Sequence, residues 1–205
     1  MRLPDTLAVI ESRVRKCRLC SLADTRKNSV PGFGKPDADI MFIGEGPGHH
    51  EDEQGLPFVG ASGRLLDDLL AGIELKREDV YITNVVKCRP PGNRDPQAEE
   101  IDACRPYLDS QIELIDPRVI VTLGRLSMAR WFPGVRISAI HGQPKRIGDR
   151  IVVPMFHPAA ALHQPKYRPM LHEDFKRLPG FISELQSQVG SEGDAEQYPE
   201  QLSLL

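Results

Sequence analysis

The chain has 205 residues, of which 40% are hydrophobic and 27% are charged, and its formal net charge is −3. This length allows one large domain or two small ones with a real core. The sequence has neither the run of about 20 apolar residues that a membrane span needs nor the apolar stretch of a signal peptide, so we expect a cytoplasmic protein without membrane contact.

The charge is unevenly distributed along the chain. The segment 188–205 carries four acidic residues and no basic one, and without it the net charge becomes +1. A near-neutral body neither favours nor excludes a local nucleic-acid groove. Because 188–205 is also poor in hydrophobic residues until its last four, we predict one domain over 1–187 followed by a disordered acidic tail.

The first half of the chain predicts two helices and two strands. Residues 5–16 are typical of a helix, and 38–48 form a short apolar strand that runs into a Gly/Pro loop. Apolar residues at helical spacing predict a helix over 60–73. The β-branched run at 79–88 predicts a strand.

The second half continues this alternation. A helix is predicted from Pro96 to about Ile115, because a proline and acidic residues open the segment. A buried strand over 117–124 and a helix over 125–132 follow. We then expect a strand leading into a loop over 150–162, and a final helix over 172–188 that breaks at Pro179-Gly180.

Strands that alternate with helices predict an α/β fold, with a mostly parallel sheet covered by helices on both faces. Such folds place their functional sites at the carboxyl ends of the strands. The loops that follow the predicted strands are therefore the first places to look for chemistry.

The four cysteines are Cys17, Cys20, Cys88 and Cys104, and the first two form a CxxC pair among basic residues. In a cytosolic chain they predict metal ligands more than disulfides. A zinc ion and an iron–sulfur cluster both remain open, with a modest preference for a [4Fe–4S] cluster because only one pair is close in sequence. Buried inert thiols are the structural alternative. A thioredoxin-like pair is disfavoured, since the CxxC precedes any βαβ unit.

The loop at 44–60 combines glycines with acidic residues. Gly44, Gly46 and Gly48 would let the backbone approach a ligand, and Glu45 and Glu51 are candidate functional carboxylates. Carboxylates repel phosphate, and the loop lacks the lysine and hydroxyl of a P-loop, so a phosphate cradle is disfavoured.

Three further residues follow or end predicted strands. Phe58 is either a core residue or a flat wall on which a base stacks. Asn84, inside a β-branched run, either ties down backbone or reads an edge with one donor and one acceptor, as a pyrimidine has. His157 lies where the last strand ends and is a candidate catalytic imidazole. Together these groups could hold a planar base and cleave its bond to a sugar.

The stretches "GEGPGHHEDEQGLPFVGASGRLLD", "VYITNVVKCRPPGNRDP", "VIVTLG" and "MFHPAAAL", taken with the four cysteines, closely resemble the family-4 (thermostable, iron–sulfur) uracil-DNA glycosylases. The resemblance covers about residues 5–178. It implies a three-layer α/β/α sandwich with a central four-stranded parallel sheet, a structural [4Fe–4S] cluster on the four cysteines, and monofunctional removal of uracil from DNA in base excision repair.

The resemblance also implies roles for individual residues. The backbone of Gly44 and Gly46 would border the uracil, Phe58 would stack on it, Asn84 would read its O4/N3 edge, and His157 would lie near O2. Glu45 resembles a carboxylate associated with the attacking water, and Glu51 matches a carboxylate beside C5 of the base. The chain departs from the family after His157, where Ala161 replaces a bulkier residue and His163 replaces a frequent arginine in a loop thought to wedge into DNA.

Two other functions remain open from the sequence. One is a non-catalytic nucleic-acid-binding module stabilised by zinc or a cluster, and the other is an enzyme acting on free nucleosides. For partners, we expect uracil-containing DNA and a monomeric protein. The ending "EQLSLL" resembles the bacterial sliding-clamp-binding peptide, with Gln201, Leu202, Leu204 and Leu205 as the contact residues.

Overall fold

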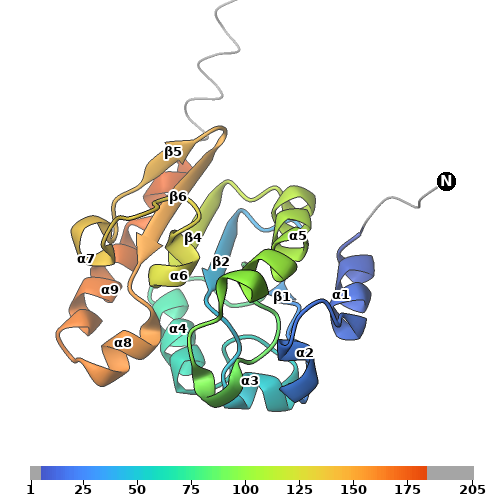
Figure 1. Ribbon diagram of the computed structural model, residues 1–205. Coiled ribbons are helices and arrows are strands. Elements are labelled where there is room, and N and C mark those ends of the chain that lie inside the picture. The colour runs from blue at the N-terminus through green and yellow to red at the C-terminus, as the bar shows by residue number, and fades with distance from the viewer. Residues whose placement is uncertain (1–5, 184–205) are drawn as a thin grey trace, which may run out of the picture.

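The computed structural model describes residues 6–183 (Figure 1). The predictions for the tail at 188–205, including the clamp-binding peptide at 201–205, lie outside the described residues, as does the end of the last predicted helix. None of the helices within 6–183 is long and apolar enough to cross a membrane.

The centre of the structure is a mixed sheet of six strands in the order β1-β3-β2-β4-β6-β5. The strands are β1 (Phe33–Gly34), β2 (Ile40–Gly44), β3 (Tyr81–Asn84), β4 (Val119–Leu123), β5 (Lys145–Ile147) and β6 (Arg150–Met155). The inner strands β3, β2, β4 and β6 run parallel to one another, and the edge strands β1 and β5 run antiparallel to their neighbours.

We predicted a sheet of four parallel strands, whereas the observed sheet has six strands and is mixed. The two additional strands are only two and three residues long, and none of their residues is buried. They lack the continuous apolar runs that identify the inner strands, where every residue of β2, β3 and β4 is buried. A strand at an edge needs no such pattern, because only one of its sides is paired.

Helices cover both faces of the sheet (Figure 1). Those of eight or more residues are α1 (Leu7–Lys16), α4 (Ala61–Ala71), α5 (Ala98–Ile115) and α9 (Tyr167–Lys176). The shorter ones are α2 (Leu22–Thr25), α3 (His49–Gln54), η1 (Pro91–Asn93), α6 (Arg125–Met128), α7 (Ile137–Ile140) and α8 (Pro158–His163).

The core follows the alternation of side chains along the strands. Phe42 and Val121 belong to a cluster with α4, α8 and α9, whereas Met41 and Ile120 belong to a second cluster with α5 and α6. Neighbouring residues of a strand point to opposite faces, so the same short strands contribute to both clusters. The result is an α/β fold with a helical layer on each side of the sheet.

Several predicted elements differ in their limits from the observed ones. The segment 44–60, predicted as a loop, contains α3, and the predicted helix over 125–132 is helical only as far as Met128. The last helix begins at Tyr167, earlier than predicted, and breaks at Arg177 before helical backbone resumes. The break precedes Pro179 because proline fits the first turn of a helix.

Candidate active site

A cleft of about 840 Å³ opens where β2, β3 and β6 end at the same edge of the sheet. Seven residues that the sequence analysis selected as candidates for a ligand site line it: Glu45, Gly46, Gly48, Glu51, Phe58, Asn84 and His157. They are spread over more than 110 positions of the chain, and the parallel sheet brings them together by aligning the carboxyl ends of its strands.

Gly44, the last residue of β2, lies directly against two of these side chains. A Cβ atom at this position would stand 2.4 Å from Oδ1 of Asn84 and 2.8 Å from the ring of Phe58. Both distances are shorter than van der Waals contact, so only glycine allows the amide and the aromatic ring to meet over the end of β2.

Asn84 ends β3 with its side chain 2% exposed. Its Oδ1 atom is buried and has no hydrogen-bond partner among residues 6–183. Buried amide oxygens are nearly always paired, and the side chain lines the cleft. The amide is therefore not locked into main-chain bonds, and its acceptor is available to a ligand.

His157 precedes α8 and caps its first turn. Its Nδ1 atom accepts a hydrogen bond of 3.1 Å from the backbone N–H of Ala159. Burial lowers the pKa of His157 to about 4, and the charge of Glu51 opposes the shift. The ring is therefore neutral at pH 7, and since Nδ1 is the acceptor, the proton is on Nε2.

Phe58 has its backbone in the left-handed region, with φ of 53°, and its side chain is buried. Nη2 of Arg77 donates to the carbonyl oxygens of Phe58 and Pro57, at 2.7 and 3.2 Å. A Cβ atom on Gly63 would stand 1.7 Å from the carbonyl oxygen of Phe58. The ring lies 5.5 Å from that of His157, with 27° between their planes.

Glu51 lines the cleft, but its carboxylate is occupied by backbone. Oε1 accepts from the N–H groups of Val59 and Gly60, each at 2.9 Å, and Oε2 accepts from that of Gly48 at 3.1 Å. The carboxylate thus ties the start of α3 to the residues that follow Phe58. These contacts hold the Phe58 loop, and because Glu51 also lines the cleft, its expected place beside the base stays a prediction.

Glu45 follows β2 directly and lines the cleft. Burial raises the pKa of its carboxyl group above the ordinary value, the charge of Asp95 raises it further, and Arg125 lowers it. A carboxyl group with a raised pKa can exchange protons nearer to neutral pH than an exposed one.

In the turn after His157, the apolar residue that faces the cleft is not Ala161, the position that the sequence analysis singled out. Ala161 is buried against the core, whereas Leu162 is 44% exposed and lines the cleft together with His163. Ala161 therefore does not form the cleft rim, and the exposed apolar residue of this turn is Leu162.

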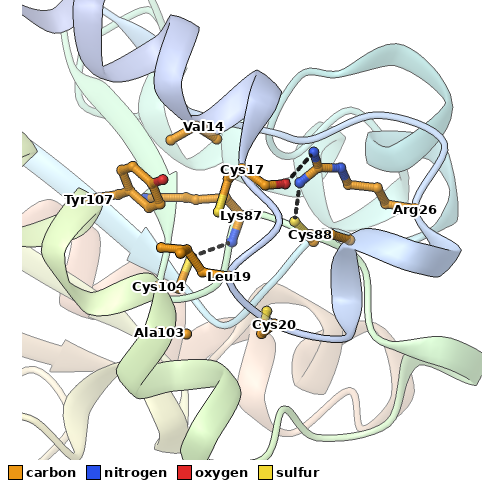
Figure 2. A pocket seen from close by; sticks show the side chains of 11 residues that line it. Val14, Cys17, Leu19, Cys20, Arg26, Lys87, Cys88, Ala103, Cys104 and Tyr107 are labelled. Atoms are coloured by element: carbon orange, nitrogen blue, oxygen red, sulfur yellow. Dashed lines mark hydrogen bonds between the residues drawn. The ribbon is translucent and has the colours of Figure 1, made fainter.

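The four cysteines line one narrow cavity away from the cleft (Figure 2). Cys17 and Cys20 come from the connection between α1 and α2, Cys88 from the segment after β3, and Cys104 from α5. Within 6–183 there is no group of three or more His, Cys, Asp and Glu residues of the kind that holds a metal ion. The lining of the cavity nevertheless includes four thiols, which come from three parts of the chain.

Positive and N–H groups face two of these sulfurs (Figure 2). Nη1 of Arg26 donates to Sγ of Cys88 at 2.9 Å, and the backbone N–H of Lys87 donates to Sγ of Cys104 at 3.2 Å. Burial raises the pKa of both thiols, that of Cys104 to about 11, so they need a bound cation to ionise at neutral pH. This donor set fits a thiolate-ligated metal group.

Sequence reasoning missed Arg77 and Lys87. Arg77 lies outside every quoted motif and has no sequence signal that links it to Phe58. Lys87 had a usable signal, since it is a charged residue inside a strand-like apolar run between Asn84 and Cys88. In the structure it is 1% exposed.

Several known proteins resemble this chain over most of its length. The model of the uracil DNA glycosylase superfamily matches residues 31–178. The type-4 uracil-DNA glycosylase of Saccharolobus solfataricus is 49% identical over 87% of this chain and 88% of its own length. That of Sulfurisphaera tokodaii is 48% identical, over 85% of this chain and 84% of its own length. That of Archaeoglobus fulgidus is 46% identical, over 85% of this chain and 92% of its own length. With a family match over most of the chain and relatives this similar, the protein belongs to the uracil DNA glycosylase superfamily and, within it, to the type-4 enzymes.

Proposed function

We propose that this protein removes uracil from DNA by hydrolysing the N-glycosidic bond, as the names of its relatives indicate for them. The observation that carries the proposal is the unpaired Oδ1 of buried Asn84, which lies over Gly44 beside the ring of Phe58 in an open cleft. Such a pocket supports recognition of a flat ring with a hydrogen-bond donor at its edge. Inside a duplex that edge is paired, so the base must leave the stack, at a cost of a few kcal/mol.

Asn84 would read the edge of the extruded base. Its Oδ1 accepts from N3–H of uracil and its Nδ2 donates to O4. Cytosine presents an acceptor at N3 and a donor at C4, so the same amide would face two mismatched groups. Leaving such buried groups unpaired disfavours cytosine.

His157 and Glu45 would carry the chemistry. As the N1–C1′ bond lengthens, uracil leaves as an anion with charge on O2, and Nε2–H of neutral His157 can donate to that oxygen. The ionised carboxylate of Glu45 can orient the water whose oxygen bonds to C1′ and accept the proton that this water loses. None of these residues is a lysine that could form a Schiff base, so an abasic site is the expected product.

The exposed side chain of Leu162 would occupy the gap that the extruded base leaves in the duplex. Apolar side chains commonly insert between base steps in this way. Its place on the cleft rim, one turn after His157, supports this role.

The four cysteines would hold a [4Fe–4S] cluster, the group that such a set of thiolates commonly binds. The cluster would supply a covalent cross-link between α5, the segment after β3 and the N-terminal helices. No step of base removal passes through it, because the cavity and the cleft have no lining residue in common.

The test is release of labelled uracil from an oligonucleotide with one deoxyuridine. We expect wild type to release uracil, and Asn84→Ala and His157→Ala to lower kcat/KM by about tenfold or more while remaining folded by circular dichroism. Exposed Lys76→Met is the control and should match wild type. No release by wild type, or equal rates on free deoxyuridine and on DNA, would contradict the proposal.

A further inference from the structure

Lys87 lies between the cysteine cavity and the cleft, and the chemistry above does not use it. It lines the cysteine cavity, and its backbone N–H donates to Sγ of Cys104 (Figure 2). It is three residues after Asn84 and one before Cys88. Its side chain is 1% exposed, which is exceptional for lysine.

All three donors of the buried ammonium have partners. Nζ donates to the backbone carbonyl of Asn84 at 2.8 Å, to Oε1 of Gln111 at 2.7 Å and to Oγ1 of Thr83 at 2.5 Å. Gln111 and Thr83 are themselves fully buried, and both donate to the carbonyl oxygen of Pro31. The ammonium is therefore the centre of a rigid polar network directly behind the residue that would read the base.

The three acceptors are neutral, and within 6–183 no carboxylate forms an ion pair with this ammonium. A buried cation is costly unless negative charge lies close by. Lys87 lines the same cavity as the four cysteines, its backbone N–H donates to Sγ of Cys104, and Cys88 is the next residue in the chain. Thiolates of a loaded metal site beside Lys87 would therefore supply the compensating negative charge.

We propose that Lys87 is a positioning residue through which the cysteine site fixes the base-reading amide of Asn84. The loaded thiolates hold the ammonium in place, and the ammonium holds the carbonyl of Asn84 at the end of β3. The next backbone N–H, that of Val85, is bound to the carbonyl of Gly44 at 2.9 Å, so the segment is fixed on both sides of Asn84. A fixed backbone holds the amide at the place from which it meets the edge of uracil, and a displaced amide would lose the bonds that distinguish uracil from cytosine.

This inference rests on the proposed excision of uracil, and its experiment separates the two. Full-length protein, purified anaerobically with its metal, is compared as wild type, Lys87→Met, Lys87→Arg and the surface control Lys76→Met. Lys87→Met keeps the length of the side chain and removes the three donors. Four quantities are measured: iron per chain, amide hydrogen exchange of residues 81–88, kcat and KM on uracil-containing DNA, and inhibition by free uracil against free cytosine.

For Lys87→Met we expect exchange at 84–86 to rise and kcat/KM to fall about tenfold or more, as a small displacement of a positioned group does. The preference for free uracil over free cytosine should fall with it, whereas a purely structural role would leave that ratio unchanged. Lys87→Arg should recover part of the loss, and Lys76→Met should equal wild type. An unchanged ratio and unchanged exchange in Lys87→Met would overturn the inference, even if wild type excises uracil.

If Lys87→Met does not fold, wild type stripped of iron by a chelator gives a second test. Exchange at 84–86 should then rise more than at 119–123 in β4, which has no contact with the cysteine cavity. Equal protection of 84–86 with and without iron would overturn the coupling. If wild type releases no uracil, the proposed function fails, while the exchange measurements still decide whether the metal site fixes Asn84.

Discussion

At the scale of single residues, the sequence identified the side chains in the cleft but not their chemical states. That His157 follows a strand and that Asn84 ends one could be predicted from the β-branched and apolar runs before them. That His157 is neutral and carries its proton on Nε2 depends on its burial and on the Ala159 N–H, which only folding brings to Nδ1. Likewise, the lack of a partner for Oδ1 of Asn84 is a property of the packed site.

These states predict the dependence of the reaction on pH. The pKa of His157 is lowered to about 4, so between pH 5 and 8 its ring stays neutral and should give no inflection near 6.5. The pKa of Glu45 is raised, and its ionised form is the active one, so the rate should rise with pH as Glu45 loses its proton. Single-turnover uracil release across pH 4.5 to 8 measures this profile, for wild type and for Glu45→Gln.

Glu45→Gln should abolish the acidic limb and lower the plateau rate by about a hundredfold, within the range for a lost general base. If the rate of Glu45→Gln still rises with pH as in wild type, the rise belongs to a different ionisable group. A wild-type inflection near the ordinary histidine pKa would contradict the neutral assignment for His157.

At the scale of elements, the loop between β2 and α4 could be predicted from the sequence only in part. Its glycines and acids were recognised as a ligand-binding segment, but its internal bonds were not. The carboxylate of Glu51 binds three backbone N–H groups, and Arg77 binds two carbonyls from twenty residues away. The bond from Gly48 to Glu51 is a capping box at the start of α3, which is a local pattern. The bonds from Val59, Gly60 and Arg77 follow no such pattern, because they join residues that meet only in the folded loop. The edge strands β1 and β5 escaped prediction for the related reason that short, half-exposed strands have no apolar run.

The close contact between Gly63 and Phe58 predicts that one added methyl group at Gly63 will lower both stability and activity. Gly63 itself does not line the cleft. In Gly63→Ala the new Cβ would collide with the carbonyl oxygen of Phe58, so the loop must shift and carry the ring with it. We expect a loss of about 1–3 kcal/mol in the free energy of unfolding. Uracil excision should also fall by about tenfold or more, mainly through a higher KM.

Gly180→Ala is the matched control, because a Cβ atom there meets nothing within 4 Å. Urea unfolding and steady-state kinetics on both variants make the comparison. Wild-type stability and KM in Gly63→Ala would show that the loop does not depend on this close approach.

At the scale of the whole molecule, the order of strands and helices was predictable because each inner strand is a buried apolar run followed by a helix with an apolar face. The four cysteines were predicted to form a metal site, but the parts of the chain that this site would connect were not predicted. In the structure, two of the thiols belong to the N-terminal connection and the other two to the β3 end and α5. A metal group bound by these thiols would thus join the N-terminal segment to the body of the fold.

This arrangement predicts where the protein opens when the proposed metal group is removed. A group that binds the folded state alone stabilises it, so chelation should lower the melting temperature. A loss of about 3 kcal/mol corresponds to a fall of about 6–12 °C in a chain of this size. Because the N-terminal helices lose their anchor first, trypsin should cut early at exposed Arg15 and Arg18, while the inner strands stay protected. Adding chelator to a Cys88→Ser variant that already lacks the metal should cause no further fall. Equal melting temperatures with and without metal, or first cuts in the body of the fold, would show that the four thiols do not anchor this segment.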